Sequence, residues 1–162
     1  MAQTTENIES DEIRRWIDHA EITELINRYA KVFDERTFTA ALPTLFIDDV
    51  HVELPPGDHR GIVDMDQFHA QVRAPFGCTQ HILTNVLTEV DLTRAVFRAN
   101  TYVTHVVLPA TGSSHDEPDN LFVAGGILSG TTVRTAQGWR FQNVVLDVVW
   151  RSGDFGPPPP EN

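Results

Sequence analysis

Cysteine and lysine are almost missing from this sequence, which contains one of each, Cys78 and Lys31. A single cysteine excludes an internal disulfide and any cysteine-rich zinc or iron–sulfur site. A single lysine leaves lysine-based covalent chemistry with only one candidate residue. The other basic residues are arginines, so covalent catalysis by a lysine is not expected.

Positive charge is scarce as well, because 12 Lys and Arg residues stand against 23 Asp and Glu residues and the formal net charge is -11. Neither a nucleic acid nor an anionic membrane is expected as a partner, since both need clustered basic residues; a neutral or weakly ionised small molecule fits better. No apolar run approaches the length of a bilayer span. The polar, acidic N-terminus does not resemble a signal peptide, so the cytoplasm is the expected location.

The 162 residues suffice for one domain with a real core and one pocket. Residues 1–9 are expected to form a flexible arm and residues 10–151 a single α+β domain. Residues 152–162 include four consecutive prolines and are expected to form a flexible tail, because proline does not join a helix or sheet interior.

The first half of the chain is predicted to be mainly helical. A short helix is expected from Ser10, and Asp18 with Glu21 has the spacing of a capping box that begins a second helix. From Ile22 to Phe33 apolar residues recur at helical spacing, so one face of this helix is buried. Further short helices are predicted within residues 37–46 and 63–75, separated by an alternating strand that ends in a Pro-Pro-Gly turn.

The second half is rich in β-branched and aromatic residues and divides into long strands. The predicted strands cover residues 79–91, 94–108, 120–134 and 138–150. Short breaks between consecutive strands favour an antiparallel meander. We therefore expect a curved antiparallel sheet wrapped around the N-terminal helices, a cone-shaped barrel with one internal pocket.

Two residues could carry chemistry together. Asp34 lies four residues after Ala30, on the apolar stripe of its predicted helix, and His81 lies in a predicted strand of sequence TQHILTN. Each has an ordinary structural interpretation, a capping aspartate or a core histidine, and spacing alone favours that interpretation for both. If both side chains point inward, the carboxylate would hold the imidazole and leave its second nitrogen basic.

Other candidate sites are weaker. No HExxH or HxH spacing is present, and the glycines of GGILSG follow no βαβ pattern, so neither a metal site nor a nucleotide-phosphate loop is expected. No GxSxG elbow surrounds a serine, and the charged loop over residues 115–117 is expected to be solvated. The candidate metal ligands are His51, Glu53, His59 and His69, and scattered surface histidines are the more common interpretation.

Several segments in order do resemble a known family. The series LINRYAKVFDERTF, LFIDDVHVEL, TQHILTN and a final GWRF…VVW strand is similar to the SnoaL-like branch of the nuclear-transport-factor-two-like superfamily, over about residues 11–151. Scytalone dehydratase and hexachlorocyclohexane dehydrochlorinase are the members it resembles most, and both are cofactor-free lyases with a His/Asp pair. The resemblance implies that Asp34 and His81 are that pair.

The resemblance also implies a set of substrate-binding wall residues, for each of which core packing is the alternative. They are Tyr29, Tyr102, Thr104, Ala124, Leu128, Gln142, Val144, Leu146, Val148 and Trp150. Tyr29 or Tyr102 would donate a hydrogen bond to a substrate oxygen. The basic residue that assists leaving-group departure in the dehydrochlorinase has no basic counterpart, since Tyr29 and Gln142 stand at the matching positions, and halide elimination is disfavoured.

The sequence therefore predicts a cofactor-free lyase, isomerase or cyclase in which His81 removes a proton from a small, oxygenated, largely apolar metabolite, in polyketide-type secondary metabolism. Two alternatives are a non-catalytic binding or assembly module of the same fold and an epoxide hydrolase, although the latter would need Asp147 from the face expected to be outer. A homo-dimer or trimer is expected, and Phe97, Val103 and Val107 could serve its interface or the core.

Overall fold

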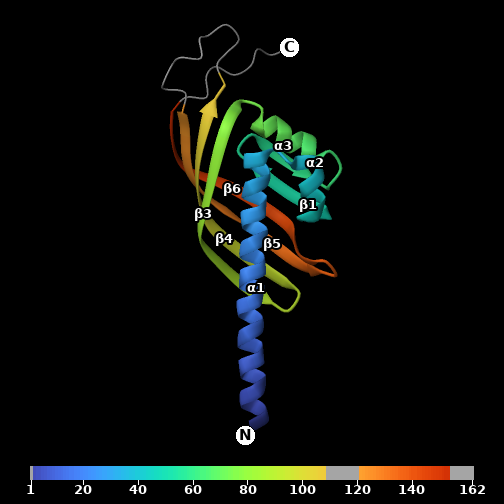
Figure 1. The fold of residues 1–162 in the computed structure, drawn as a ribbon. Helices are drawn as coiled ribbons and strands as arrows, with labels where there is room; N and C mark the ends of the chain where they lie inside the picture. The colour runs from blue at the N-terminus through green and yellow to red at the C-terminus, as the bar shows by residue number, and fades with distance from the viewer. Residues whose placement is uncertain (1, 109–120, 154–162) are drawn as a thin grey trace.

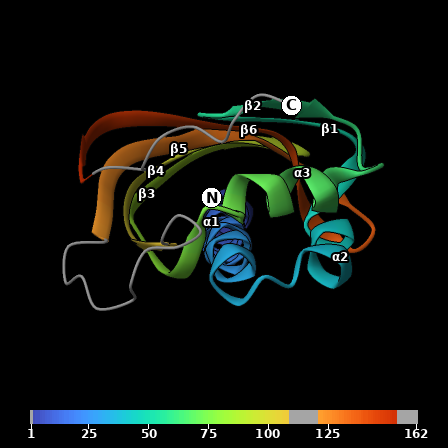
Figure 2. The ribbon, with the colours of Figure 1, turned by 90° about the horizontal axis from the view of Figure 1, so that it is seen from above.

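A computed structural model describes residues 2–108 and 121–153, with side chains from Ser10 onward. The charged loop over residues 115–117 and the proline-rich stretch lie outside the described residues. The helical elements precede most of the sheet and cover its concave side (Figures 1 and 2). They are α1 (Ala2–Glu35), α2 (Phe38–Ala41), the 3-10 turn η1 (Leu42–Thr44) and α3 (Met65–Arg73).

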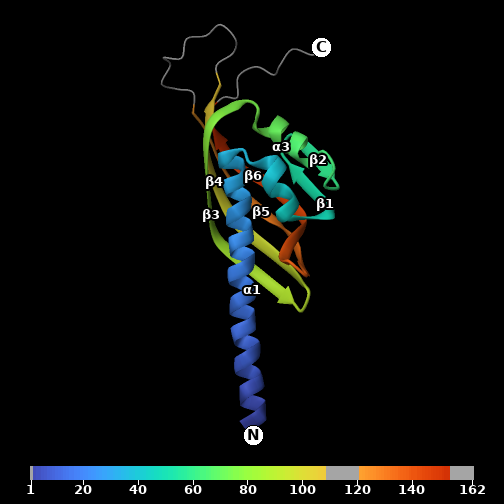
Figure 3. The same ribbon diagram turned by 45° about the vertical axis from the view of Figure 1, so that its right-hand side comes forward.

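Helix α1 is continuous, whereas the sequence predicted a flexible arm over residues 1–9 and a new helix start at Asp18. No glycine or proline interrupts residues 2–35, so nothing in the sequence breaks the helix. Asp18 does not cap a helix; its carboxylate is buried and paired with Arg134 and, at 3.6 Å, with Arg14. The N-terminal part of α1 extends beyond the sheet (Figures 1 and 3).

Six strands form one sheet in the order β2-β1-β6-β5-β4-β3. The four long predicted strands are present with shifted ends, and they pair antiparallel as expected. The strands are β1 (Phe46–Leu54), β2 (Gly57–Arg60), β3 (Phe76–Asp91), β4 (Arg94–Val107), β5 (Leu121–Thr135) and β6 (Gly138–Ser152).

The sheet is mixed and open rather than wholly antiparallel and closed. Strand β1 pairs parallel with β6, because the chain leaves the β1–β2 hairpin through α3 and enters the opposite edge at β3. Strands β2 and β3 are therefore the two edges of the sheet, and no pairing between them closes a barrel among the described residues. The sheet arches over α1 and α3, which positions a cavity on its concave face (Figure 2).

Alternation along β4 sends every second side chain to the concave face. Ala95 and Phe97 are buried against the helices, whereas Arg94, Val96 and Arg98 are exposed on the convex face. Val103 and Val107 belong to a second buried cluster on the concave side. None of the three residues considered for an oligomer interface is therefore on the outer surface, and the homo-oligomer stays a prediction. No helix within the described residues is long and apolar enough to cross a bilayer.

Candidate active site

The end of helix α1 fixes the position of Asp34. Arg36 adopts a left-handed conformation (φ 55°), and the Thr37 amide donates to the Val32 carbonyl at 3.3 Å, which is the pattern of a Schellman cap. Asp34 thus lies in the last turn, where the helix dipole disfavours a carboxylate unless a cation or a hydrogen-bond donor faces it.

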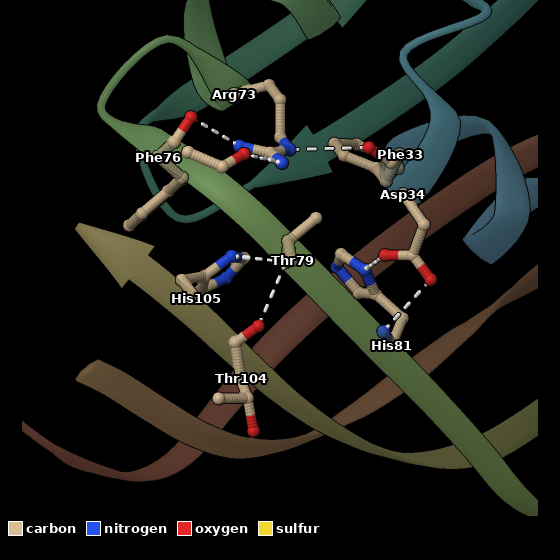
Figure 4. A network of polar contacts seen from close by, with 9 residues as sticks. Phe33, Asp34, Arg73, Phe76, Thr79, His81, Thr104 and His105 are labelled. Carbon is tan, nitrogen blue, oxygen red and sulfur yellow. Dashed lines mark hydrogen bonds and ion pairs between the residues drawn. The ribbon is translucent and has the colours of Figure 1, made fainter. Parts of the chain in front are cut away.

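His81 supplies both of the donors that Asp34 needs (Figure 4). The Asp34 carboxylate accepts from His81 Nδ1 at 2.7 Å and from the His81 backbone amide at 3.1 Å. The amide is available because β3 is an edge strand, so half of its N–H groups face away from β4. The sequence-based expectation that these two side chains meet is thus realised in the geometry, with one carboxylate holding both the ring and the backbone of His81.

The contact with Asp34 assigns the proton of neutral His81 to Nδ1, since an ionised carboxylate can only accept a hydrogen bond. Among the described residues Nε2 has no hydrogen-bond partner, and His81 lines the cavity. The His81 side chain is 15% exposed, enough for a ligand to reach it. His81 therefore presents a lone pair to a space where a substrate could lie.

The cavity has a volume of about 650 Å³ and lies between the concave sheet face and helices α1 and α3. Its walls are mostly apolar, with a few polar groups near β3 and the end of α3. Of the sequence-predicted wall residues, five line it: Tyr29, Ala124, Leu128, Leu146 and Val148.

The prediction was wrong for two wall residues in β4, because it assigned the even-numbered side chains of this strand to the concave face. Tyr102 and Thr104 lie on the convex side, whereas Thr101, Val103 and His105 line the cavity. Tyr102 is 43% exposed. The arginines and the asparagine at even positions of β4 were the sequence signal for an outward face.

The prediction was also wrong for three wall residues in β6, which are Gln142, Val144 and Trp150. Gln142 accepts from Arg94 at 2.6 Å, and Val144 is fully buried in the main core. A register shift opposite Gly125 and Gly126 turns Trp150 outward, where its ring packs on Tyr102 with centroids 5.9 Å apart. The neighbouring Arg151 lines the cavity instead. A Cβ on Gly126 would lie 2.5 Å from the Asp147 carbonyl, so the shifted pairing needs glycine there.

His105 was not predicted as a site residue, and it lines the cavity beside the proposed dyad. Its Nδ1 lies 2.6 Å from the Thr79 hydroxyl, and its ring stacks on Phe76 at 3.9 Å and lies 5.6 Å from the His81 ring. Burial, with smaller effects from the charges of His81 and Arg73, lowers the pKa of His105 to about 4. His105 is therefore a neutral imidazole near pH 7.

Arg73 was also missed, because a basic residue in the last turn of a helix normally reads as solvated. Its guanidinium is buried and donates to the backbone carbonyls of Phe33, Phe76 and Gly77 (Figure 4). These bonds join the last turn of α1, which carries Asp34, to the first residues of β3, which carries His81. Arg73 and Arg151 both line the cavity, and neither was among the predicted wall residues.

The histidines once considered as metal ligands have separate protein partners. His69 is fully buried and bonds Tyr29, His59 stacks on Phe68, and His51 lies 3.4 Å from Asp58. No group of three or more His, Cys, Asp or Glu side chains gathers at one point within the described ranges.

The Tyr29 hydroxyl has a fixed role in this arrangement. His69 Nδ1 lies 2.8 Å from the Met65 carbonyl and must donate to it, so Nε2 accepts from Tyr29 at 2.9 Å. Burial lowers the pKa of His69 to about 4, and it raises the pKa of Tyr29 above its usual value, so both rings stay neutral. Because its proton is committed to His69, Tyr29 is not the donor to a substrate oxygen that the sequence suggested.

Fold and sequence together define the class of protein. The SnoaL-like domain model matches residues 14–145, and the chain therefore belongs to the SnoaL-like domain family. This confirms the resemblance seen in the sequence.

Several solved structures have a similar fold. An NTF2-like superfamily protein from Salmonella enterica has a TM-score of 0.70 and 22% identity, over 83% of this chain and 92% of that one. A putative scytalone dehydratase from Novosphingobium aromaticivorans has a TM-score of 0.73 and 18% identity, over 86% and 89%. A hexachlorocyclohexane dehydrochlorinase of type 2 has a TM-score of 0.74 and 17% identity, over 92% and 98%. No curated protein matches the sequence.

Proposed function

We propose that this protein is a cofactor-independent enzyme of the lyase or isomerase type, in which His81 removes a proton from carbon. The observation that carries the proposal is the 2.7 Å contact between Asp34 and Nδ1 of His81, a residue that lines the cavity and whose Nε2 has no hydrogen-bond partner among the described residues. Support also comes from the fold, whose neighbours include proteins described as a dehydratase and a dehydrochlorinase.

The proposed step needs only groups of this chain and a carbonyl substrate. His81 Nε2 takes the proton from the carbon next to the carbonyl, and the C–H electron pair becomes the C=C bond of an enolate, whose charge rests on oxygen. Asp34 stabilises the resulting imidazolium through Nδ1. In a dehydration, the enolate then expels a β-hydroxyl, which leaves as water with the proton from His81; isomerisation would return that proton to another carbon.

The mostly apolar cavity wall favours a small, largely apolar substrate with one or two oxygens. Dehydration, isomerisation and ring closure all begin with the same proton abstraction. Proton abstraction can be tested without the natural metabolite and without assuming a role in polyketide-type metabolism.

Proton abstraction can be tested by hydrogen exchange without knowing the natural product. The protein is incubated in D₂O with a panel of small cyclic and aromatic ketones, and loss of the C–H signal next to the carbonyl is followed by NMR. We expect the wild type to accelerate exchange for at least one compound, and His81→Gln to lower that rate about 10²-fold or more. His59→Gln, at a histidine that stacks on Phe68 and donates to the Val63 carbonyl at 2.8 Å, is the matched control and should keep the rate.

Equal exchange by the wild type and His81→Gln would overturn the assignment of the base. Tight binding of ketones with no exchange above background would instead indicate the binding-module alternative.

A further inference from the structure

The charges on the cavity wall differ from those of the chain as a whole. The chain carries a formal charge of -11, yet the residues that line the cavity include Arg73, Arg151, His81 and His105 and no aspartate or glutamate within the described part of the chain. Asp34 is not among the lining residues, and its carboxylate accepts two hydrogen bonds from His81. Although the protein is acidic, the described lining of this cavity contains arginines and no carboxylate.

Arg73 is the more deeply fixed of the two cations. It is 2% exposed, and its Nε, Nη1 and Nη2 each donate one hydrogen bond to a backbone carbonyl. A guanidinium has five N–H groups, so two remain after these three bonds. No carboxylate lies within ion-pair distance of Arg73 in the parts of the chain that the structure describes. A buried cation that borders a cavity without a paired anion attracts an anionic ligand, because little water is present to screen it.

The position of Arg73 connects it to the proposed chemistry. Arg73 donates to the Phe76 carbonyl, the Phe76 ring stacks on His105, and the His105 ring lies 5.6 Å from that of His81 (Figure 4). Arg73, His81 and His105 therefore lie near the start of β3. The rest of the lining is mostly apolar and includes Leu128 and Leu146.

We propose that the cavity binds a ligand with an anionic oxygen, and that Arg73 is the residue that binds this oxygen while the apolar wall contacts the hydrocarbon body. The proposal rests on the proposed function and deepens it, because the enolate formed when His81 removes a proton carries such an oxygen. The same guanidinium geometry suits a carboxylate that the substrate carries before reaction. In this proposal Arg73, and not the hydroxyl of Tyr29 or Tyr102, donates hydrogen bonds to the substrate oxygen.

Matched pairs of ligands separate these two sources of negative charge. Benzoate and benzamide have nearly the same shape and differ in charge, and their dissociation constants are compared by calorimetry. Bound 4-nitrophenol mimics an enolate, and its absorbance reports the ionised fraction at fixed pH. We expect benzoate to bind at least about tenfold more tightly than benzamide if the substrate carries a carboxylate, and 4-nitrophenol to bind mainly as phenolate if the anion is formed only during reaction.

Variants assign the effect to a residue. Arg73→Met should remove the preference for the anion, Arg73→Lys should keep part of it, and Arg98→Met, on the convex face, should leave it unchanged. His81→Gln should also keep the preference, so a failure of the proton-exchange test and a failure of this one are distinct. If Arg73→Met does not fold, the wild-type comparison and Arg73→Lys decide the matter.

Three results would overturn the proposal. They are no anion preference in the wild type with either probe, including no binding at all; an undiminished preference in Arg73→Met; and a preference lost in Arg151→Met but kept in Arg73→Met.

Discussion

His81 on β3 and His69 on α3 have the same pattern of protonation but opposite surroundings. In both, Nδ1 donates to an oxygen, the Asp34 carboxylate for His81 and the Met65 carbonyl for His69. The ring of Phe33 contacts both histidines, at 5.5 and 5.1 Å. The difference lies at Nε2, which has no hydrogen-bond partner among the described residues in His81 and accepts the Tyr29 proton in His69.

This difference shows what separates a base from a core histidine. A carboxylate at Nδ1 stabilises the imidazolium that a base becomes, whereas a neutral carbonyl in a buried site does so far less. An open Nε2 can take a proton, and one that already accepts from a phenol cannot. His69 should therefore affect stability, and His81 should affect turnover.

The largest effect is expected for His81→Gln, which keeps a polar side chain but removes the base. Activity on any substrate found by hydrogen exchange should fall about 10²- to 10⁴-fold, because general base catalysis contributes that much. Thermal stability should change little, since His81 lies at an edge strand and is partly exposed. Steady-state kinetics and a melting curve check both parts, and a large loss of stability with intact activity would reverse the comparison.

A stability effect that depends on pH is expected from His69. Its pKa is lowered to about 4 in the folded protein from 6.5, so the unfolded chain binds more protons between these values. Folding stability should be complete above pH 6.5 and fall as the pH drops toward 4, by up to about 3 kcal/mol from this residue. His105 has a pKa shift in the same direction and adds to the slope.

Urea unfolding at several pH values measures this slope, and His69→Leu should reduce it. A slope that is unchanged in His69→Leu would contradict the burial argument.

At neutral pH, His69→Leu itself should lower the free energy of unfolding by about 2 kcal/mol. The substitution leaves the Tyr29 hydroxyl and the Met65 carbonyl without their partner in a buried place. Turnover should change much less than in His81→Gln. Urea unfolding and kinetics on the same preparation test this, and a loss of activity as large as that of His81→Gln would assign His69 a chemical role.

The smallest effect is expected for Tyr29→Phe, which removes only the hydroxyl that donates to His69. Stability should fall by about 1 kcal/mol, the usual net value of one hydrogen bond. Since the Tyr29 proton is not available to a substrate, kcat should stay within a few-fold of the wild type. A fall in kcat of more than about 10²-fold, with stability kept, would return Tyr29 to the donor role suggested by the sequence.

Local patterns predicted much of this fold. The apolar stripe in α1 and the four long strands follow from side-chain periodicity, and the place of Asp34 on that stripe follows with them. The parallel partner of β6 did not, because β1 reaches it through a long-range pairing that no local signal marks. The break assigned at Asp18 was wrong for a similar reason, since its partner Arg134 lies 116 residues away.

The site was only partly predictable. The meeting of Asp34 with His81 came from family resemblance, because two residues 47 apart carry no periodic signal of contact. Tyr102 was predicted to line the cavity and His105 was not, because the alternating side chains of β4 were assigned to the wrong faces. The charged residues of β4 indicate which face is outer. The bulge at Gly125 and Gly126 could not be located from alternation, so Trp150 was assigned inward where Arg151 stands.

The position of the ring proton of His81 shows, without any substrate, whether this residue can act as the base. Two-dimensional ¹H–¹⁵N NMR of ¹⁵N-histidine-labelled protein in neutral solution distinguishes the two neutral tautomers from imidazolium, and His81→Gln identifies the signals of His81. We predict that the neutral form of the ring has its proton on Nδ1 and an unprotonated Nε2. A proton on Nε2 with Nδ1 bare would contradict this prediction, because His81 could then neither donate to Asp34 nor accept a proton from a substrate at the cavity wall.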